Sequence, residues 1–400
     1  MQTNIIEAIK HSSQGQEAND ILRSCVHCGF CNATCPTYQL LGDELDGPRG
    51  RIYMIKQALE GGEVSRKTQI HLDRCLTCLS CETTCPSGVR YSRLVDIGRE
   101  WVDHRVNRSV MEKTKRWVLR RILPYKQRFA LLLGLGRALR PFLPSRLKRL
   151  IPVLLLPVYP EKNHSRTLLL LDGCVQPTLA PNINAATARV LDRLGFSLIS
   201  VPGAGCCGAV SLHLTATEEA KNFMRGNIDA WWPYLEQGAE ALVVTASGCG
   251  VVVKEYGYHL RNDPLYAEKA HRISSMTRDL SEILAEQDLS VLRRENRQGK
   301  IAFHAPCSLQ HGLKINSVVE SILTRTGFTL TTVADSHLCC GSAGTYSLLQ
   351  SELSQRLLTN KVKALESEDP DMIATANIGC LHHIAQGSDV PVRHWIELLD

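Results

Sequence analysis

Two short runs of cysteine constrain this chain of 400 residues more than any other feature. Each run has the spacing C-x2-C-x2-C-x3-C followed by proline, first at residues 25–36 and again at residues 75–86. One such run could arise by chance in a chain with sixteen cysteines, but two identical runs 50 residues apart are hard to explain that way. The fold must therefore bring eight thiol groups into a common arrangement.

The spacing within each run is that of bacterial ferredoxins, which hold two iron–sulfur clusters. Three thiolates at intervals of three residues bind one cluster, and the fourth, next to the proline, is directed to the other cluster. This crossed arrangement predicts a first ligand group of Cys25, Cys28, Cys31 and Cys85, and a second ligand group of Cys75, Cys78, Cys81 and Cys35. A pair of zinc ions is the alternative, but it leaves the third close cysteine and the Cys-Pro ending without a role. We predict two [4Fe–4S] clusters and a path for single electrons.

The other eight cysteines form an internal repeat. Each copy contains one cysteine, then a Cys-Cys-Gly sequence, then a last cysteine, and the copies are offset by 131 to 133 residues. The first copy comprises Cys174, Cys206, Cys207 and Cys249, and the second comprises Cys307, Cys339, Cys340 and Cys380. Vicinal cysteines do not readily form an unstrained disulfide with each other, and soft thiolates favour iron–sulfur ligation or redox chemistry. We expect at least one further cluster or metal centre here, with unmetallated thiols or a relic fold as the alternatives.

Apolar segments around these cysteines predict a parallel sheet in each copy. Strands are expected at residues 167–174, 196–201 and 241–249 of the first copy, and at 300–307, 328–333 and 372–380 of the second. Helices between the strands indicate an α/β fold in which both faces of the sheet are covered. Because ligands of such sheets sit beyond the carboxyl ends of the strands, three loops could gather four thiolates.

Two further patterns lie near these cysteines. Residues 203–208 match the dinucleotide pattern G-x-G-x-x-G, but the second copy keeps the cysteines and loses the first two glycines. We therefore reject a NAD or FAD site there. Four histidines flank the cysteines of the second copy, and we expect each to be a hydrogen-bonded side chain near a loop rather than a ligand: His304, His311, His382 and His383. Of these, His304 and His383 are the first to test as ligands.

The cysteine patterns divide the chain into four regions. Residues 1–98 hold both ferredoxin runs and, between them, a helical stretch at residues 49–60, which predicts an α-helical ferredoxin-like domain. A basic helical linker is expected at residues 99–160, followed by the two Cys-Cys-Gly domains at residues 161–295 and 296–400.

The basic charge lies in one block of the chain. Residues 99–150 carry a net charge of +12, against −1 for residues 1–98 and −5 for residues 151–400. Leucine patches alternate with arginine there, which fits helices packed on the protein's own domains, or amphipathic helices at an anionic membrane surface or an acidic partner. No motif for reading nucleic acid accompanies the charge. Without a signal peptide or an apolar stretch approaching 18 residues, we expect a cytoplasmic protein, peripheral at the cytoplasmic face of the inner membrane.

Two ferredoxin runs followed by two Cys-Cys-Gly domains resemble the iron–sulfur subunits of bacterial glycolate oxidase. Relatives of that family are the corresponding subunits of anaerobic glycerol-3-phosphate dehydrogenase, lactate-utilisation systems and heterodisulfide reductase. The resemblance covers nearly the whole chain and is closest at residues 25–36, 45–52 and 303–312. It implies a complex with flavin-binding subunits, one of which oxidises glycolate to glyoxylate, and a membrane quinone or another carrier as electron acceptor. The C-x2-C ending of the heterodisulfide reductase type is missing after Cys249 and Cys380, so its non-cubane cluster is not carried over.

The chain itself shows no flavin or nicotinamide site and no paired acid and base for hydride abstraction. We therefore predict the electron-transfer subunit of a flavin-dependent glycolate dehydrogenase, with the two-electron step on another chain. The equivalent subunit of a lactate or glycerol-3-phosphate enzyme is the first alternative. A heterodisulfide-reductase-like thiol enzyme, with its active site in the Cys-Cys-Gly domains, and a zinc-stabilised scaffold are the others.

Overall fold

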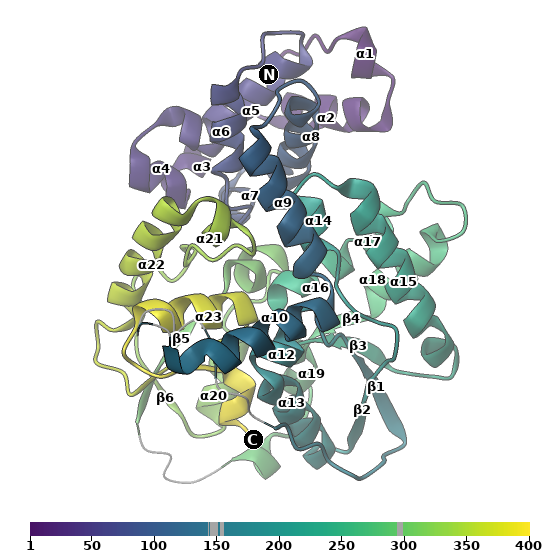
Figure 1. Ribbon diagram of the computed structural model, residues 1–400, viewed down its shortest axis with the longest axis vertical. Coiled ribbons are helices and arrows are strands. Elements are labelled where there is room, and N and C mark those ends of the chain that lie inside the picture. The colour runs from purple at the N-terminus through teal and green to yellow at the C-terminus, as the bar shows by residue number, and fades with distance from the viewer. Residues whose placement is uncertain (143, 145–150, 153–155, 294–298) are drawn as a thin grey trace. The chain divides into compact units, whose positions relative to one another are not determined.

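The computed structural model of the chain describes residues 1–142, 144, 151, 152, 156–293 and 299–400 (Figure 1). The described residues form two compact units. The first unit comprises Met1–Trp117 and His337–Lys361, and the second comprises Val118–Ser336 and Val362–Asp400. A segment of the second Cys-Cys-Gly copy therefore belongs to the first unit, which the spacing of the cysteines did not indicate.

Helices are the only regular elements among the described residues of the first unit. In chain order they are α1 (Glu7–Lys10), α2 (Ser13–Ser24), α3 (Phe30–Ala33), α4 (Pro36–Leu41), η1 (Glu44–Asp46), α5 (Pro48–Leu59), α6 (Arg66–Asp73), α7 (Ser80–Thr84), α8 (Tyr91–Asp103) and α21 (Tyr346–Leu349). Two more, α9 (Val110–Ile122) and α22 (Ser351–Leu365), contain residues of both units.

The core of the first unit lies between α2, α5 and α8. Leu22, Ile55 and Leu94 are fully buried there. Gly98 lets α5 and α8 approach closely, because a Cβ at this position would lie 2.6 Å from the side chain of Ile55. Long helix α5 falls between the two cysteine runs, as the sequence predicted, and the α-helical character of this domain is confirmed.

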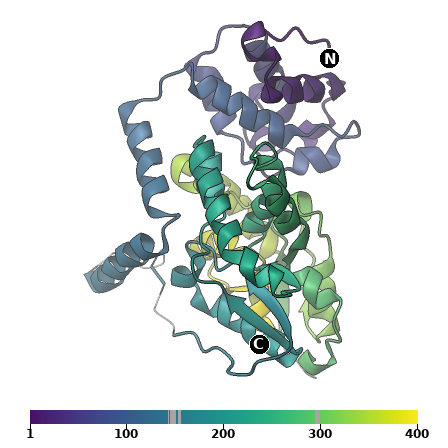
Figure 2. The ribbon, with the colours of Figure 1, turned by 90° about the vertical axis from the view of Figure 1, so that its right-hand side faces the viewer.

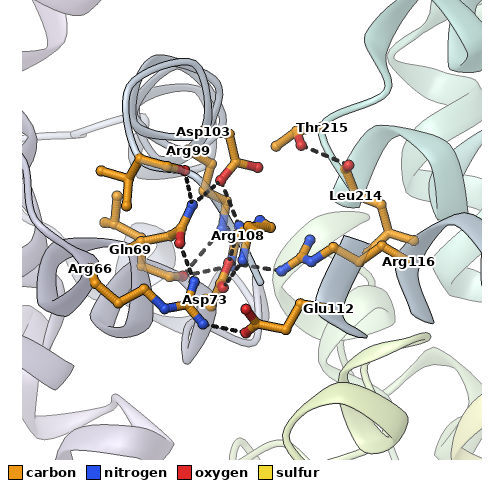
Figure 3. A network of polar contacts seen from close by, with 12 residues as sticks. Arg66, Gln69, Asp73, Arg99, Asp103, Arg108, Glu112, Arg116, Leu214 and Thr215 are labelled. Atoms are coloured by element: carbon orange, nitrogen blue, oxygen red, sulfur yellow. Dashed lines mark hydrogen bonds and ion pairs between the residues drawn. The ribbon is translucent and has the colours of Figure 1, made fainter. Parts of the chain in front are cut away.

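A network of arginines and acidic side chains ties the start of the basic block to α6 (Figure 3). The guanidinium of Arg108 lies 2.5 Å from Asp73 and 2.6 Å from Asp103, and that of Arg116 lies 3.1 Å from Asp73. Burial alone would raise the pKa of the Asp73 carboxyl, but the two arginines outweigh this effect and lower that pKa. Part of the basic charge of residues 99–150 is therefore neutralised within the first unit.

The second unit contains two parallel sheets of four strands each. The first sheet consists of β1 (Arg166–Leu170), β2 (Phe196–Ser200), β3 (Ala241–Val244) and β4 (Thr277–Asp279), and the second of β5 (Lys300–His304), β6 (Thr329–Leu330), β7 (Met372–Thr375) and β8 (Val392–His394). Their strand orders, β2-β1-β3-β4 and β6-β5-β7-β8, are the same. The predicted α/β class and its internal repeat are confirmed. Strand β6 has only two residues, and β1 ends before Cys174 rather than at it.

Helices follow the strands in both copies. The helices that lie wholly in the described part of the second unit, including two before β1, are α10 (Lys126–Leu139), η2 (Arg140–Phe142), α12 (Gln176–Leu179), α13 (Pro181–Arg193), α14 (Ala209–His213), α15 (Thr217–Glu236), α16 (Ser247–Lys254), α17 (Tyr256–His259), α18 (Ala267–Met276), α19 (Leu280–Ala285), η3 (Ser290–Leu292), η4 (Ser308–Gly312), α20 (Val318–Arg325), α23 (Ile378–Gly387) and η5 (Trp395–Leu398). Phe196, Phe303 and Trp395 belong to one core that draws on both sheets. The two sheets are therefore parts of one compact body.

Helix α10 lies at the edge of the second unit (Figure 2). Two of its basic side chains bond to the body of the unit: Lys126 Nζ lies 2.9 Å from Asp172 Oδ2, and Arg137 Nη2 donates to the carbonyl oxygen of Thr178 at 2.8 Å. Its exposed apolar side chains are Leu131, Leu132, Leu135 and Leu139. Four exposed leucines on one helix depart from the usual arrangement of a surface helix, in which the apolar stripe faces the core. No helix in the described part of the chain is long and apolar enough to cross a membrane.

Candidate cluster-binding sites

The structure brings together the thiols of the first ligand group. Cys25, Cys28, Cys31 and Cys85 line one pocket, which Cys81 also reaches. Burial, together with the nearby charges of Cys25, Cys85 and Cys28, raises the pKa of Cys31 to about 11. Three of the four predicted ligands in this pocket come from the first run and one from the second.

The second ligand group gathers in the same way. Burial raises the pKa of Cys81, and the charges of three neighbouring thiols, Cys78, Cys75 and Cys35, add to that rise. All sixteen cysteines lie in the described residues, and none of them forms a disulfide. Cys81 therefore lies near three thiols of the second predicted group, of which Cys35 comes from the first run.

A repeated backbone conformation orients the thiols within each run. His27 and Gly29 of the first run have φ of 59° and 87°, and Thr77 and Leu79 at the corresponding positions of the second have φ of 54° and 64°. A left-handed conformation costs a residue other than glycine about 1–2 kcal/mol. Three residues other than glycine adopt it here, so the loop geometry is kept at a cost in stability.

Polar side chains surround the second group. The hydroxyl of Tyr91 donates to Cys75 Sγ at 3.7 Å, and Thr37 Oγ1 lies 3.3 Å from Cys35 Sγ. The hydroxyl of Ser80, next to Cys81, is buried and has no hydrogen-bond partner among the described residues. A buried hydroxyl without a partner costs free energy, and a cluster sulfur beside it would accept its hydrogen bond. Soft thiolate donors and this unpaired hydroxyl both fit an iron–sulfur cluster.

A buried ion network lies against the second group. Arg51 donates to the carbonyl oxygen of His71 at 2.8 Å and lies 3.5 Å from Asp46, whose carboxylate also binds Arg74 at 2.8 Å. Arg51 and Asp46 are almost completely buried. Burial favours the neutral form of Arg51, but the negative charges around it, Cys75 first among them, outweigh burial and raise its pKa. Arg51 therefore places a permanent positive charge beside these thiols. Arg51 lies within residues 45–52, where the family resemblance is close, but the sequence did not predict a role for it.

The four thiols of the first Cys-Cys-Gly copy also converge. Cys206 hydrogen-bonds to Cys174 and Cys207, and these bonds raise its pKa. Cys249 bonds to Cys207, which raises the pKa of Cys249 as well. Gly208, which follows the cysteine pair, has a φ of 95°, and a Cβ there would lie 3.0 Å from the Ala220 carbonyl oxygen. Glycine is therefore required for the loop that presents both thiols.

Two buried residues that the sequence patterns did not indicate hold this loop. Asn227 donates to the carbonyl oxygen of Cys206 at 2.8 Å and accepts from the amide of Gly205 at 2.8 Å. Tyr256 donates to the carbonyl oxygen of Cys207 at 2.9 Å. Both come from helices far along the chain, and no local motif marks them.

The second copy is divided between the two units. In the first unit, the amide of Gly341 donates to Cys339 Sγ at 3.4 Å, which matches the bond from Gly208 to Cys206 in the first copy. In the second unit, Asn377 Nδ2 donates to Cys380 Sγ at 3.5 Å. Of the remaining two thiols, Cys340 in the first unit is buried, and Cys307 in the second unit is partly exposed.

The histidines near these cysteines differ in burial. His304, at the end of β5, and His383, on α23, are buried, whereas His311 and His382 are partly exposed. Burial lowers the pKa of His382. A fifth histidine, His394, is completely buried, and its Nε2 lies 2.9 Å from the carbonyl oxygen of Thr245. It joins the two sheets and has no cysteine beside it in the sequence.

Comparison with known protein families shows which class of protein the chain belongs to. Residues 21–89 match the model of the 4Fe-4S dicluster domain, and residues 168–254 and 301–385 each match that of the cysteine-rich domain. Together with the converging thiols, these matches define an iron–sulfur electron-transfer protein.

Individual relatives narrow the class to a family. The glycolate oxidase iron-sulfur subunit of Escherichia coli K12 is 56% identical over 402 residues, covering 100% of this chain and 98% of the relative. A probable glycolate oxidase iron-sulfur subunit of Bacillus subtilis 168 is 29% identical over 92% of this chain and 89% of its own. Lactate utilization protein A of Bacillus licheniformis is 27% identical over 57% of this chain and 96% of its own. The chain belongs to the family of glycolate oxidase iron–sulfur subunits, as the resemblance of its motifs indicated.

Proposed function

We propose that the chain carries electrons from a flavin-binding subunit that oxidises glycolate to glyoxylate towards a membrane quinone. The observation that carries the proposal is the 56% identity to a glycolate oxidase iron-sulfur subunit over the whole chain. Oxidation of glycolate to glyoxylate releases two electrons and two protons. No flavin motif occurs in the chain, so the two-electron step belongs to another subunit, and single electrons pass through this one.

The first unit would hold two [4Fe–4S] clusters, which accept and release one electron each. One would be bound by Cys25, Cys28, Cys31 and Cys85, and the other by Cys75, Cys78, Cys81 and Cys35. Neighbouring thiols raise the pKa of Cys31 and that of Cys81, which requires the sulfur atoms to lie close together and supports this grouping. Tyr91 and Arg51 would stabilise negative charge on the second cluster by a hydrogen bond and by charge.

The Cys-Cys-Gly copies would hold one or two further clusters. The first copy has the stronger support, because Cys174, Cys206, Cys207 and Cys249 interact with one another. Its Asn227 and Tyr256 would keep the loop in place for a metal. The second copy would use Cys307, Cys339, Cys340 and Cys380.

The basic block would bring the complex to the cytoplasmic face of the inner membrane. The exposed leucines of α10, together with the net charge of residues 99–150, support a peripheral contact with anionic lipid. Quinone as the acceptor fits this location.

Anaerobic purification of the full chain with iron and sulfide analysis tests the cofactors. Two clusters require about eight irons per chain, and clusters in the Cys-Cys-Gly copies require more. Zinc without acid-labile sulfide would exclude an electron carrier. The substrate is tested on the complex purified from its host, by comparing cluster bleaching after addition of glycolate, lactate or glycerol-3-phosphate. Bleaching by lactate alone would assign the chain to the lactate enzymes, which the similarity to lactate utilization protein A leaves as the second candidate.

A further inference from the structure

One thiol stands out from the other cysteines by its accessibility. Of the sixteen cysteines, all of which the structure describes, Cys28 is the only exposed one. It belongs to the first ligand group and lines the pocket that this group shares. A cluster in that pocket would therefore have the edge near Cys28 closest to solvent.

Exposed apolar side chains lie on the loop that carries Cys28 and on the neighbouring helix α5. Val26 is 68% exposed, Phe30 is 64% exposed and Tyr53 is 46% exposed. The ring of Tyr53, on α5, lies edge-on to the ring of His27 with their centroids 6.1 Å apart, so α5 and the cysteine loop contribute to the same surface. An exposed apolar surface that includes a redox ligand is characteristic of an interaction site rather than of a solvated face.

The second ligand group offers no comparable access. Three of its thiols, Cys35, Cys75 and Cys81, are buried, and Cys78 is only partly exposed. Arg51 and Tyr91 pack beside them and are buried as well. Of the two groups in the first unit, the first is therefore the more accessible to another protein.

We propose that Val26, Phe30 and Tyr53 form the docking surface for the flavin-binding subunit, and that electrons enter the chain at the first ligand group. This inference rests on the proposed function for the presence of a cluster there. In each transfer the flavin of the partner loses one electron and the cluster gains one. Two transfers balance the two electrons released from one substrate molecule.

The observations favour a redox partner over the other occupants of an apolar surface. A second copy of this chain would place two identical clusters opposite each other, and equal potentials give no net electron flow. An anionic membrane would require unpaired basic charge, but Arg49, the arginine that lines the pocket, lies 2.5 Å from Glu44 and is paired. A flavoprotein with an apolar surface around its cofactor has a different redox centre from this chain, and its docking requires no unpaired basic charge.

Charged substitutions on this surface test the proposal in the cluster-loaded full chain. The variants are Phe30→Glu and Tyr53→Asp, and Leu348→Glu is the matched control because Leu348 is an exposed leucine of the same unit, 58% exposed. Tyr53 has no cysteine next to it in the sequence, so its variant keeps the test valid if Phe30→Glu loses its cluster. The probe is the flavin-binding subunits purified from the same host. Binding affinity is measured directly, and cluster content is checked by iron analysis and electron paramagnetic resonance.

We expect both variants to bind the flavin-binding subunits at least tenfold more weakly than the wild type, with unchanged reduction by dithionite. The control should bind normally. Affinities within twofold of the wild type in cluster-loaded variants would overturn the inference and leave the proposed function intact. Loss of binding to anionic vesicles, with normal binding of the flavin-binding subunits, would assign the surface to lipid and overturn it too. Failure of glycolate to reduce the wild-type clusters through those subunits would instead count against the proposed function.

Discussion

The hydroxyl of Tyr91 lies 3.7 Å from the sulfur of Cys75 and donates a hydrogen bond to it. Tyr91 begins α8 and is buried, and burial raises the pKa of its hydroxyl, so the proton stays on the oxygen to be donated. A hydrogen bond to a cluster ligand stabilises the reduced, more negative cluster. The second ligand group thus has a donor that the backbone of its own run does not supply.

Replacement of Tyr91 by phenylalanine should lower one reduction potential. The ring is retained and the hydrogen bond to Cys75 is lost, so the cluster of the second group becomes harder to reduce. A redox titration followed by electron paramagnetic resonance measures both potentials in one sample, and the cluster of the first group is the internal control. Equal shifts of both potentials, or none, would contradict a specific role for Tyr91.

Serine substitutions should remove the two clusters of the first unit separately. Cys28→Ser and Cys78→Ser each take away a thiolate that supplies both negative charge and an iron bond. Each variant should lose about four irons and one spectroscopic signal. Quinone reduction by the assembled complex should also be lost, while dye reduction by the flavin-binding subunits continues. Quinone reduction at the wild-type rate in either variant would argue against the proposed electron path.

Substitution of Asn227 should disturb the first Cys-Cys-Gly loop. Its side chain bonds to the backbone of both Cys206 and Gly205, and alanine would leave these buried groups without partners. Each unsatisfied group costs about 1–3 kcal/mol, so we expect Asn227→Ala to lower the free energy of unfolding by about 3 kcal/mol. Chemical denaturation measures it. Asn222→Ala on the exposed side of the same helix is the control and should change stability by less than about 0.5 kcal/mol. A similar effect of both variants would show that the loop does not depend on Asn227.

Acid should destabilise the second unit through His394. Burial lowers the pKa of His394 to about 4. The unfolded chain binds a proton near pH 6.5, well before the folded chain does, so stability falls as the pH drops from about 6.5 to about 4. The shift corresponds to about 3 kcal/mol over that window. Denaturation at several pH values should show a shallower loss in His394→Gln than in the wild type. Parallel pH profiles would contradict this assignment.

The exposed leucines of α10 should contribute to membrane binding. Leu135 is 57% exposed, and glutamate there would place a charge in the apolar contact and reduce the net basic charge. We expect Leu135→Glu to lower co-sedimentation with phosphatidylglycerol vesicles severalfold, and high salt to weaken the binding of the wild type. Leu265→Glu is the control, since Leu265 is 78% exposed on another segment of the same unit. If salt does not weaken the binding and both variants still bind the vesicles, α10 does not contribute to membrane binding.

The repeat was predictable because cysteine positions are direct constraints on the fold. The offset between the two Cys-Cys-Gly copies indicated two sheets of the same topology, and both have the same strand order. Strand lengths were less predictable. The segment at residues 328–333 reads as a full strand, yet only Thr329–Leu330 pairs in the sheet. Local apolar pattern shows where a strand can form, whereas pairing depends on a neighbour that comes from a distant part of the chain.

The basic block, residues 99–150, was likewise only partly predictable from the sequence. Its arginines and leucines allowed helices packed on the protein or helices exposed to a partner. In the structure Arg108 and Arg116 bond to Asp73, while no residue of α10 is buried. Charge in a sequence does not reveal which side chains find a partner, because the partners lie on other elements.

Cysteine spacing was sufficient to predict the family and the internal repeat, and the predicted crossed grouping of the ferredoxin thiols rests on the same spacing. These features depend on distances along the chain, which the sequence contains. The positions of Arg51 and Tyr91 beside the second group, the hold of Asn227 on the Cys-Cys-Gly loop and the exposure of Cys28 emerged only in the folded chain. Each depends on contacts or solvent access set by packing between distant segments, and no local pattern encodes them.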